Sequence, residues 1–149
     1  MSHEQLAEAL IPLSRGSTWE EARHEWELEH IFRQAWRQKC LSGRFPIREI
    51  CVLRNRLTEQ RAEVGNVCVK KFLGLPSDKI LTALARVLKA VERAVGPETV
   101  EHAHRLRWIS DWERHFYLDT WRKRTLTDSQ LVKRVEINRR ILRRTQRSR

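Results

Sequence analysis

The chain has 149 residues, of which 40% are hydrophobic, and it carries a formal net charge of +11. This length predicts one domain, residues 1–149, with enough apolar residues to bury a core. The sequence has no run of about eighteen apolar residues and no basic flank before an N-terminal apolar block, so we expect no membrane span, no membrane partner and no secretory signal. Three cysteines give no disulfide framework, which favours a reducing, cytoplasmic location.

Residues 1–39 are expected to form N-terminal helices. Residues 4–12 predict a short helix that ends near Pro12, and residues 18–38 predict a helix of about twenty residues. Thr18 and Glu21 have the spacing of a capping box at the start of the second helix. Three tryptophans recur along one side of that helix, which we expect to be buried: Trp19, Trp26 and Trp36.

Residues 40–75 predict a small β-hairpin followed by a helical turn. The apolar, β-branched residues 46–53 indicate a strand, and residues 62–67 indicate the strand that returns. Asn55 and Thr58 suit the turn between them. A helical turn then begins near Cys68 and stops at Gly74.

The remainder of the chain predicts a helical body, residues 76–126, and a basic C-terminal helix, residues 127–149. Helices are expected over residues 77–95, 97–106 and 109–124, with Ser110 or Asp111 as the N-cap of the third. Thr127 or Asp128 is expected to cap the last helix. The predicted fold class is therefore mainly α with a small β-hairpin (α+β), a knuckle–hairpin–helix core packed among several helices.

The basic excess lies at the C-terminal end of the chain. Residues 121–149 hold eleven Lys and Arg against two Asp and Glu, whereas residues 1–120 hold nineteen against seventeen. We expect Leu131, Val135, Ile141 and Leu142 to face inward and the basic side chains to face outward, toward an anionic partner. The alternative is a charged helix kept for solubility. The candidate binding residues are Arg122, Lys123, Arg124, Lys133, Arg134, Arg139, Arg140, Arg143, Arg144 and Arg147.

All three cysteines, Cys40, Cys51 and Cys68, lie in residues 40–75. The stretch opens with Cys-x-Ser-Gly, and Cys68 follows at the start of a helical turn, where the helix dipole favours a thiolate. A knuckle, a hairpin and a helix in this order are typical of a treble-clef zinc finger. Zinc is therefore a candidate ligand, with the three cysteines as candidate metal ligands.

The same stretch resembles a family of small bacterial and mobile-element proteins of poorly defined function. Their signature is a Cys-x-Cys-Gly knuckle followed by Val-Gly-x-x-Cys-Val-x-x-Phe, and the likeness extends over most of the chain. The resemblance implies a small zinc-finger-like core within a helical protein. The matching positions are Cys40, Gly43, Pro46, Ile47, Arg54, Asn55, Val64, Gly65, Asn66, Cys68, Val69, Lys71 and Phe72.

The chain departs from this signature at the metal ligands. Ser42 stands where a second knuckle cysteine is expected, and Arg44 stands where similar proteins can place a histidine. Structural zinc sites are almost always built from four Cys or His ligands. Cys51 is either a third ligand or a small buried residue. We expect less than stoichiometric zinc and no other cofactor, with the stem of Arg44 filling the vacated site.

No phosphate-binding loop, nucleophile elbow or His-Glu-x-x-His motif occurs in the sequence. We therefore expect no enzymatic activity and no small-molecule substrate. The leading hypothesis is a nucleic-acid-associated binding protein that uses its basic C-terminal helix, with weak sequence specificity. The alternative is a phage or mobile-element interaction protein that binds or inhibits a host protein or nucleoprotein complex.

Overall fold

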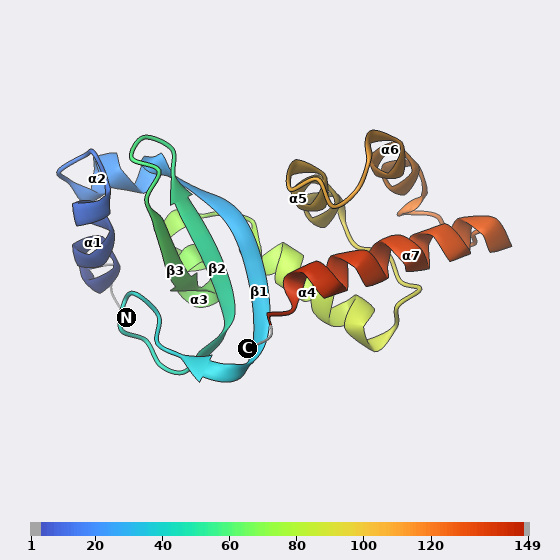
Figure 1. The fold of residues 1–149 in the computed structure, drawn as a ribbon, viewed down its shortest axis with the longest axis horizontal. Helices are drawn as coiled ribbons and strands as arrows, with labels where there is room; N and C mark the ends of the chain where they lie inside the picture. The colour runs from blue at the N-terminus through green and yellow to red at the C-terminus, as the bar shows by residue number, and fades with distance from the viewer. Residues whose placement is uncertain (1–3, 148–149) are drawn as a thin grey trace. The chain divides into compact units, whose positions relative to one another are not determined.

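The computed structural model describes residues 4–147, and these residues form a mainly helical chain with one antiparallel sheet of strand order β1-β2-β3 (Figure 1). This arrangement confirms the predicted α+β class. The described residues form two compact units, residues 4–78 with Arg147 and residues 79–146. The single domain expected from the length stays a prediction. Within residues 4–147, no helix has the length and apolar character needed to cross a membrane.

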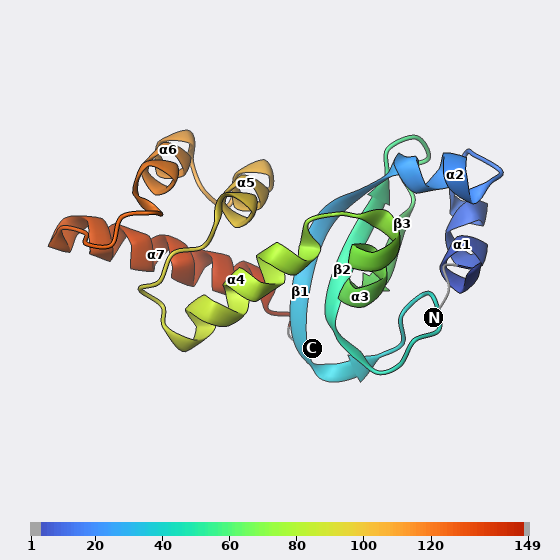
Figure 2. The same ribbon diagram turned by 180° about the vertical axis from the view of Figure 1, so that it is seen from behind.

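The first unit begins with α1 (Glu4–Leu10) and a short 3-10 turn, followed by α2 (Trp19–Ala22). The sheet consists of β1 (Trp26–Gln38), β2 (Ile47–Asn55) and β3 (Arg61–Gly65). Figure 2 shows α3 (Asn66–Cys68) and the π-helical turn after it lying over one face of this sheet. Cys68 and Val69 are fully buried there, so the hairpin and the helical turn share one core.

The prediction of one helix over residues 18–38 is wrong, because most of these residues form strand β1. Thr18 does cap a helix by accepting a hydrogen bond from Glu21 N, but α2 ends after one turn at Ala22 and β1 follows. The buried positions of β1 are Trp26, Leu28, Ile31 and Gln34. Two register shifts, between Leu28 and His30 and between Arg33 and Gln38, explain this spacing, because an irregularity in a strand breaks the two-residue alternation. The result imitates a helical period.

The hairpin of β2 and β3 agrees with the sequence-based prediction. Asn55 Oδ1 accepts hydrogen bonds from Leu57 N (2.9 Å) and Thr58 N (3.0 Å), which fixes the turn. The backbone after Leu73 reverses at Gly74, whose φ of 64° is in the left-handed region. The helical segment therefore stops at the glycine that the sequence indicated.

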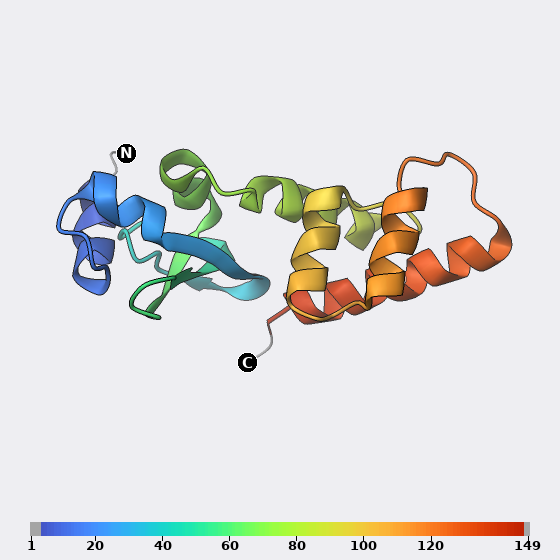
Figure 3. The same ribbon diagram turned by 90° about the horizontal axis from the view of Figure 1, so that it is seen from above.

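The second unit contains most of α4 (Ser77–Lys89), together with α5 (Pro97–Arg105), α6 (Asp111–Thr120) and α7 (Asp128–Thr145). In Figure 3, α5 and α6 stand side by side and α7 runs along their ends. Both predicted N-caps are confirmed, since Ser110 and Thr127 each form a complete capping box. The expected helix over residues 77–95 is shorter than predicted, because α4 ends at Lys89.

A buried polar network holds the loop between α4 and α5. Asn138 Nδ2 donates to the carbonyl oxygens of Val91 (2.7 Å) and Arg93 (2.6 Å). Tyr117 Oη donates to Asn138 Oδ1 (2.6 Å) and accepts from Val95 N (2.9 Å). Both side chains are fully buried, so a loop with no secondary structure of its own is fixed to α6 and α7.

Candidate functional site

Helix α7 carries most of the predicted binding residues, and its buried face is not the one expected. Ile137 and Ile141 are buried together with polar residues: Arg134, Asn138 and Thr145. Leu131, expected to face inward, is 38% exposed, whereas the expected burial of Ile141 is confirmed. The helix is turned by about one residue from the apolar stripe, because Asn138 and Arg134 have hydrogen-bond partners inside the unit.

Arg134 corrects the expectation that it faces outward. Its side chain is buried, and its Nη2 donates a hydrogen bond to the carbonyl oxygen of Thr120 (2.7 Å) at the end of α6. Its guanidinium carbon lies 5.8 Å from the centre of the Tyr117 ring. Arg134 therefore stabilises the end of α6 and is not available to an outside partner.

Lys133 and Arg140 both bind the buried carboxylate of Glu113. Lys133 Nζ lies 2.9 Å from Glu113 Oε2, and Arg140 Nη1 lies 2.8 Å from Glu113 Oε1. Burial raises the pKa of Glu113, but the hydrogen bonds from Arg140, the Ser110 backbone and Lys133 outweigh it and lower the pKa to about 2. Both cations, expected to face an anionic partner, already have an internal anion.

Arg147 belongs to the first unit. Its Nη1 lies 2.9 Å from Glu63 Oε1, and its guanidinium carbon lies 4.2 Å from the centre of the Phe32 ring. The hydrogen bond from Arg147 lowers the pKa of Glu63, with burial acting in the opposite direction. Arg147, the last described residue, therefore binds the sheet of the first unit and is not part of an outward-facing basic group on α7.

The other predicted cations remain at the surface. Arg139, Arg143 and Arg144 are exposed on α7, and among residues 4–147 no carboxylate lies within ion-pair distance of them. A second exposed group lies in the connection between α6 and α7: Arg122, Lys123 and Arg124. The guanidinium carbon of Arg122 lies 4.9 Å from the centre of the Trp121 ring. Six of the ten predicted side chains are therefore accessible to a partner.

An apolar groove of about 640 Å³ adjoins these arginines on α7. Val132 is 68% exposed and Leu131 is 38% exposed, and the groove continues along the helix to Arg139 and Arg143. Sequence reasoning placed Leu131 inward and gave Val132 no role. The available signal was a β-branched apolar residue on a helix face that is otherwise polar.

The structure brings Cys40, Ser42 and Cys68 together in the first unit. Ser42 Oγ donates a hydrogen bond to Cys40 Sγ (3.0 Å) and lies 3.3 Å from Cys68 Sγ. Gly65 N also donates to Cys40 Sγ (3.2 Å). Burial raises the pKa of the Cys68 thiol, and the Ser42 hydrogen bond partly offsets this effect. The buried knuckle is thus joined to the start of α3 by hydrogen bonds to sulfur.

These residues do not fit a closed structural zinc site. Two thiols and one hydroxyl do not make the usual four-ligand Cys/His set, and no metal-holding group of three or more His, Cys, Asp or Glu occurs among residues 4–147. Cys51, on β2, takes no part in the hydrogen bonds described around Ser42, and burial raises the pKa of its thiol to about 12. Less than stoichiometric zinc stays a prediction.

Arg44 corrects one detail of the expected module. The hydroxyl of Ser42, not the stem of Arg44, lies between the two thiols. Arg44 is exposed and lines a surface pocket instead. The hydrogen-bonded Ser42 side chain occupies the place between the two sulfur atoms, so the aliphatic stem of Arg44 has no vacated site to fill.

No protein-family model matches this chain, and no curated protein and no solved structure is significantly similar to it. The resemblance of residues 40–75 to a treble-clef module therefore stays a prediction based on residue order and spacing.

Proposed function

We propose that this chain is a non-enzymatic, nucleic-acid-associated binding protein that contacts phosphate groups through its C-terminal helix. The observation that carries the proposal is the contrast within α7. Arg134 and Arg140 are held by partners inside the second unit, whereas Arg139, Arg143 and Arg144 are exposed and have no carboxylate partner among residues 4–147. Cations without internal partners are the ones that phosphates can neutralise.

The spacing of these arginines supports an anionic partner. Arg139 and Arg143 are four residues apart on one helix, and such a like-charge pair is destabilising by about 0.2–0.5 kcal/mol. Phosphate groups would relieve that repulsion. Arg122, Lys123 and Arg124 precede the helix and supply further exposed charge. Contacts to phosphate carry no sequence information of their own, so we expect weak sequence specificity.

The test is a charge-neutralised variant that spares the structural cations. Arg139→Gln, Arg143→Gln and Arg144→Gln together should fold like the parent and bind duplex DNA and RNA at least about tenfold more weakly. The matched control neutralises three exposed cations elsewhere in the second unit: Lys89→Gln, Arg93→Gln and Arg107→Gln. Both triple variants lose the same net charge. Equal affinities for the two variants would contradict a dedicated binding face on α7.

A second candidate function is supported by the apolar groove. Val132 and Leu131 are exposed beside Arg139 and Arg143. Exposed apolar side chains contribute little to phosphate contacts, but apolar anchors with arginine at their edge are common in protein interfaces. In this case the chain is a phage or mobile-element interaction protein that binds or inhibits a host protein or nucleoprotein complex. Arg139 and Arg143 would face an acidic surface of that host partner.

One double variant separates the two functions. Leu131→Ser with Val132→Ser keeps every cation of α7 and removes the apolar anchors. A nucleic-acid-binding protein should retain its affinity for DNA and RNA after this change. If the protein instead binds a host protein, the variant should no longer capture that partner in a pull-down from the native host. In that case the parent and the variant should both bind bare nucleic acid only weakly.

We also propose that the protein acts in the cytoplasm. Its three cysteines are free and buried, which is consistent with a reducing compartment. Alkylation with a small maleimide before and after unfolding of protein taken from its native host tests this proposal. Three reactive thiols after unfolding without reductant are expected, and fewer would contradict it.

A further inference from the structure

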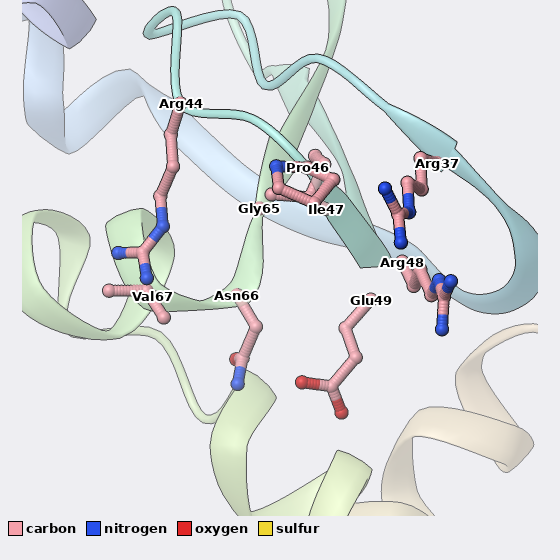
Figure 4. Close-up of a pocket in the computed structure, with 9 residues that line it drawn as sticks. All are labelled: Arg37, Arg44, Pro46, Ile47, Arg48, Glu49, Gly65, Asn66 and Val67. Atoms are coloured by element: carbon pink, nitrogen blue, oxygen red, sulfur yellow. The ribbon is translucent and has the colours of Figure 1, made fainter.

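A surface pocket of about 390 Å³ lies in the first unit, where the end of β1, the start of β2 and the start of α3 meet (Figure 4). Three of its lining residues are arginines: Arg37 on β1, Arg44 in the loop before β2, and Arg48 on β2. Glu49 is the only carboxylate among the lining residues. A pocket of this volume is in the range that holds one small ligand.

The three arginines are exposed, and within residues 4–147 none of them has an ion-pair partner. Other arginines of the same unit do: Arg54 and Arg61 each bind a glutamate of β1. The pocket therefore gathers guanidinium groups that the fold leaves without a carboxylate. Figure 4 shows Arg37 and Arg48 on one side of the pocket and Arg44 on the other.

Arg37 and Arg48 lie next to the pair of residues at which the pairing of β1 with β2 ends. Gln38 on β1 pairs with Ile47 on β2, and the register of the two strands is irregular between Arg33 and Gln38. Arg37 and Arg48 both line the pocket next to this last pair, and Figure 4 shows them on the same side of it. Like charges that lie close together repel each other. An anion bound between Arg37 and Arg48 would offset this repulsion, so the repulsion favours anion binding.

The charge of the pocket matches a phosphate monoester. Three arginines and one glutamate give a formal charge of +2 (3 − 1), and a phosphate monoester carries close to −2 at neutral pH. The planar guanidinium fork also matches phosphate oxygens in geometry, by paired N–H···O hydrogen bonds. Pro46 and Val67 add apolar wall against which the remainder of a ligand can pack.

We propose that this pocket binds the phosphate monoester of a nucleotide. Arg37 and Arg48 hold the phosphate together, Arg44 approaches from the loop, and the nucleoside lies against Pro46 and Val67. The phosphate has two sources with the same chemistry, a free mononucleotide or the 5′-phosphate at the end of a nucleic-acid strand. The strand source rests on the function proposed above, whereas the mononucleotide source is independent of it.

The experiment is an NMR titration of the full chain with adenosine 5′-monophosphate, with adenosine as the control ligand. The monophosphate should shift the amide resonances of residues 47–49 and 65–67, and adenosine should not. The variant Arg37→Gln with Arg48→Gln should bind at least about tenfold more weakly, because it loses two charge-assisted contacts. Lys39→Gln removes an exposed charge that does not line the pocket, and should bind like the parent.

Glu49→Gln provides a test of opposite sign. Removing the only carboxylate among the lining residues should tighten monophosphate binding by about threefold or more, since a nearby like charge weakens anion binding. Absence of amide shifts at 10-fold molar excess and beyond, up to about 10 mM ligand, would overturn the proposal. Equal binding by the Arg37/Arg48 and Lys39 variants would also overturn it.

Two single-stranded oligonucleotides of one sequence, with and without a 5′-phosphate, distinguish the sources. Preference for the phosphorylated strand, lost in the Arg37/Arg48 variant, assigns the pocket to strand ends. Binding of the monophosphate without any strand binding assigns it to mononucleotides, and then the proposed function fails while the pocket stands. Loss of strand binding only in the Arg139/Arg143/Arg144 variant supports the function proposed for α7. The pocket is then tested by the monophosphate titration alone.

Discussion

Ser42 shows how one residue changes the chemistry of a small module. Its hydroxyl lies between the sulfur atoms of Cys40 and Cys68, where a metal-binding knuckle would place a third thiol. A hydroxyl at this position donates a hydrogen bond to sulfur, but it is a poor ligand for zinc at neutral pH. The structure therefore joins the knuckle to α3 by hydrogen bonds and buried packing.

Restoring the thiol should restore metal affinity. Ser42→Cys places a third sulfur beside Cys40 and Cys68, so the variant should bind Cd²⁺. Its ultraviolet absorbance from thiolate-to-metal charge transfer should rise in proportion to the added Cd²⁺. The parent should show a much weaker band. Leu41→Cys is the matched control, because this exposed neighbour adds a thiol outside the buried contact. Equal bands for the two variants would show that the knuckle geometry is not metal-competent.

Glu113 predicts a specific loss of stability in acid. Its pKa in the folded protein is about 2, below the 4.5 of an ordinary glutamate, so its charged form is stabilised by folding. This contribution, on the order of 3 kcal/mol, is present above about pH 4.5 and is lost as the pH falls toward 2. Urea unfolding of the parent and of Glu113→Gln should differ most at pH 6 and converge near pH 2.

Glu92→Gln is the control for this pH dependence, since Glu92 is exposed. Its free energy of unfolding should follow that of the parent at every pH. A constant difference between the parent and Glu113→Gln from pH 6 to pH 2 would show that the ion pairs of Glu113 with Arg140 and Lys133 do not control its titration.

At the scale of elements, capping and turn residues were predictable and long-range pairing was not. Ser110, Thr127, Asn55 and Gly74 act within a few residues of their own position, so their roles follow from local sequence. β1 depends on pairing with β2, which lies about twenty residues further along the chain. The sequence of β1 carries a helix-like period, so local reasoning chose the wrong element.

NMR chemical shifts test β1 directly. The Cα resonances of residues 26–33 should lie upfield of their random-coil values, as in a strand, because these residues pair with β2. The residues of α7 serve as an internal control and should show the downfield shifts of a helix. Helical shifts over residues 26–33 would contradict the three-stranded sheet.

The polar network of α6 and α7 predicts a coupled loss of stability. Tyr117→Phe leaves the buried Val95 N–H and Asn138 Oδ1 without their partner, and should cost about 1–3 kcal/mol. Asn138→Ala should cost at least as much, because two loop carbonyls lose their donor. In a double-mutant cycle the two losses should add to more than the loss of the double variant. Strict additivity would show that the network is not a unit.

At the scale of the whole molecule, the described cations near the C-terminal end of the chain divide into structural and exposed groups. Residues 121–147, the part of this segment that the structure describes, supply ion pairs to Glu113 and Glu63 and a buried partner to Thr120, as well as exposed cations. Composition located the charge correctly, but it could not separate structural from accessible cations. That separation depends on where Glu113 and Thr120 of the preceding helix α6 lie in the fold, which the composition of α7 does not contain.

The pocket of Arg37 and Arg48 was also beyond local reasoning. The two residues are eleven positions apart, and they line one pocket because β1 pairs with β2 as far as Gln38 and Ile47. Residues expected in a helix gave no reason to examine Arg37 together with Arg48.

The salt dependence of nucleic-acid binding tests the central claim most directly. Each phosphate contact contributes about 0.9 to the slope of log affinity against log salt concentration for duplex DNA. Replacing Arg139, Arg143 and Arg144 with Gln should therefore reduce the magnitude of the parent's slope by about 2–3, whereas the Lys89, Arg93 and Arg107 control should keep it. An unchanged slope and affinity in the α7 variant would contradict phosphate binding by this helix.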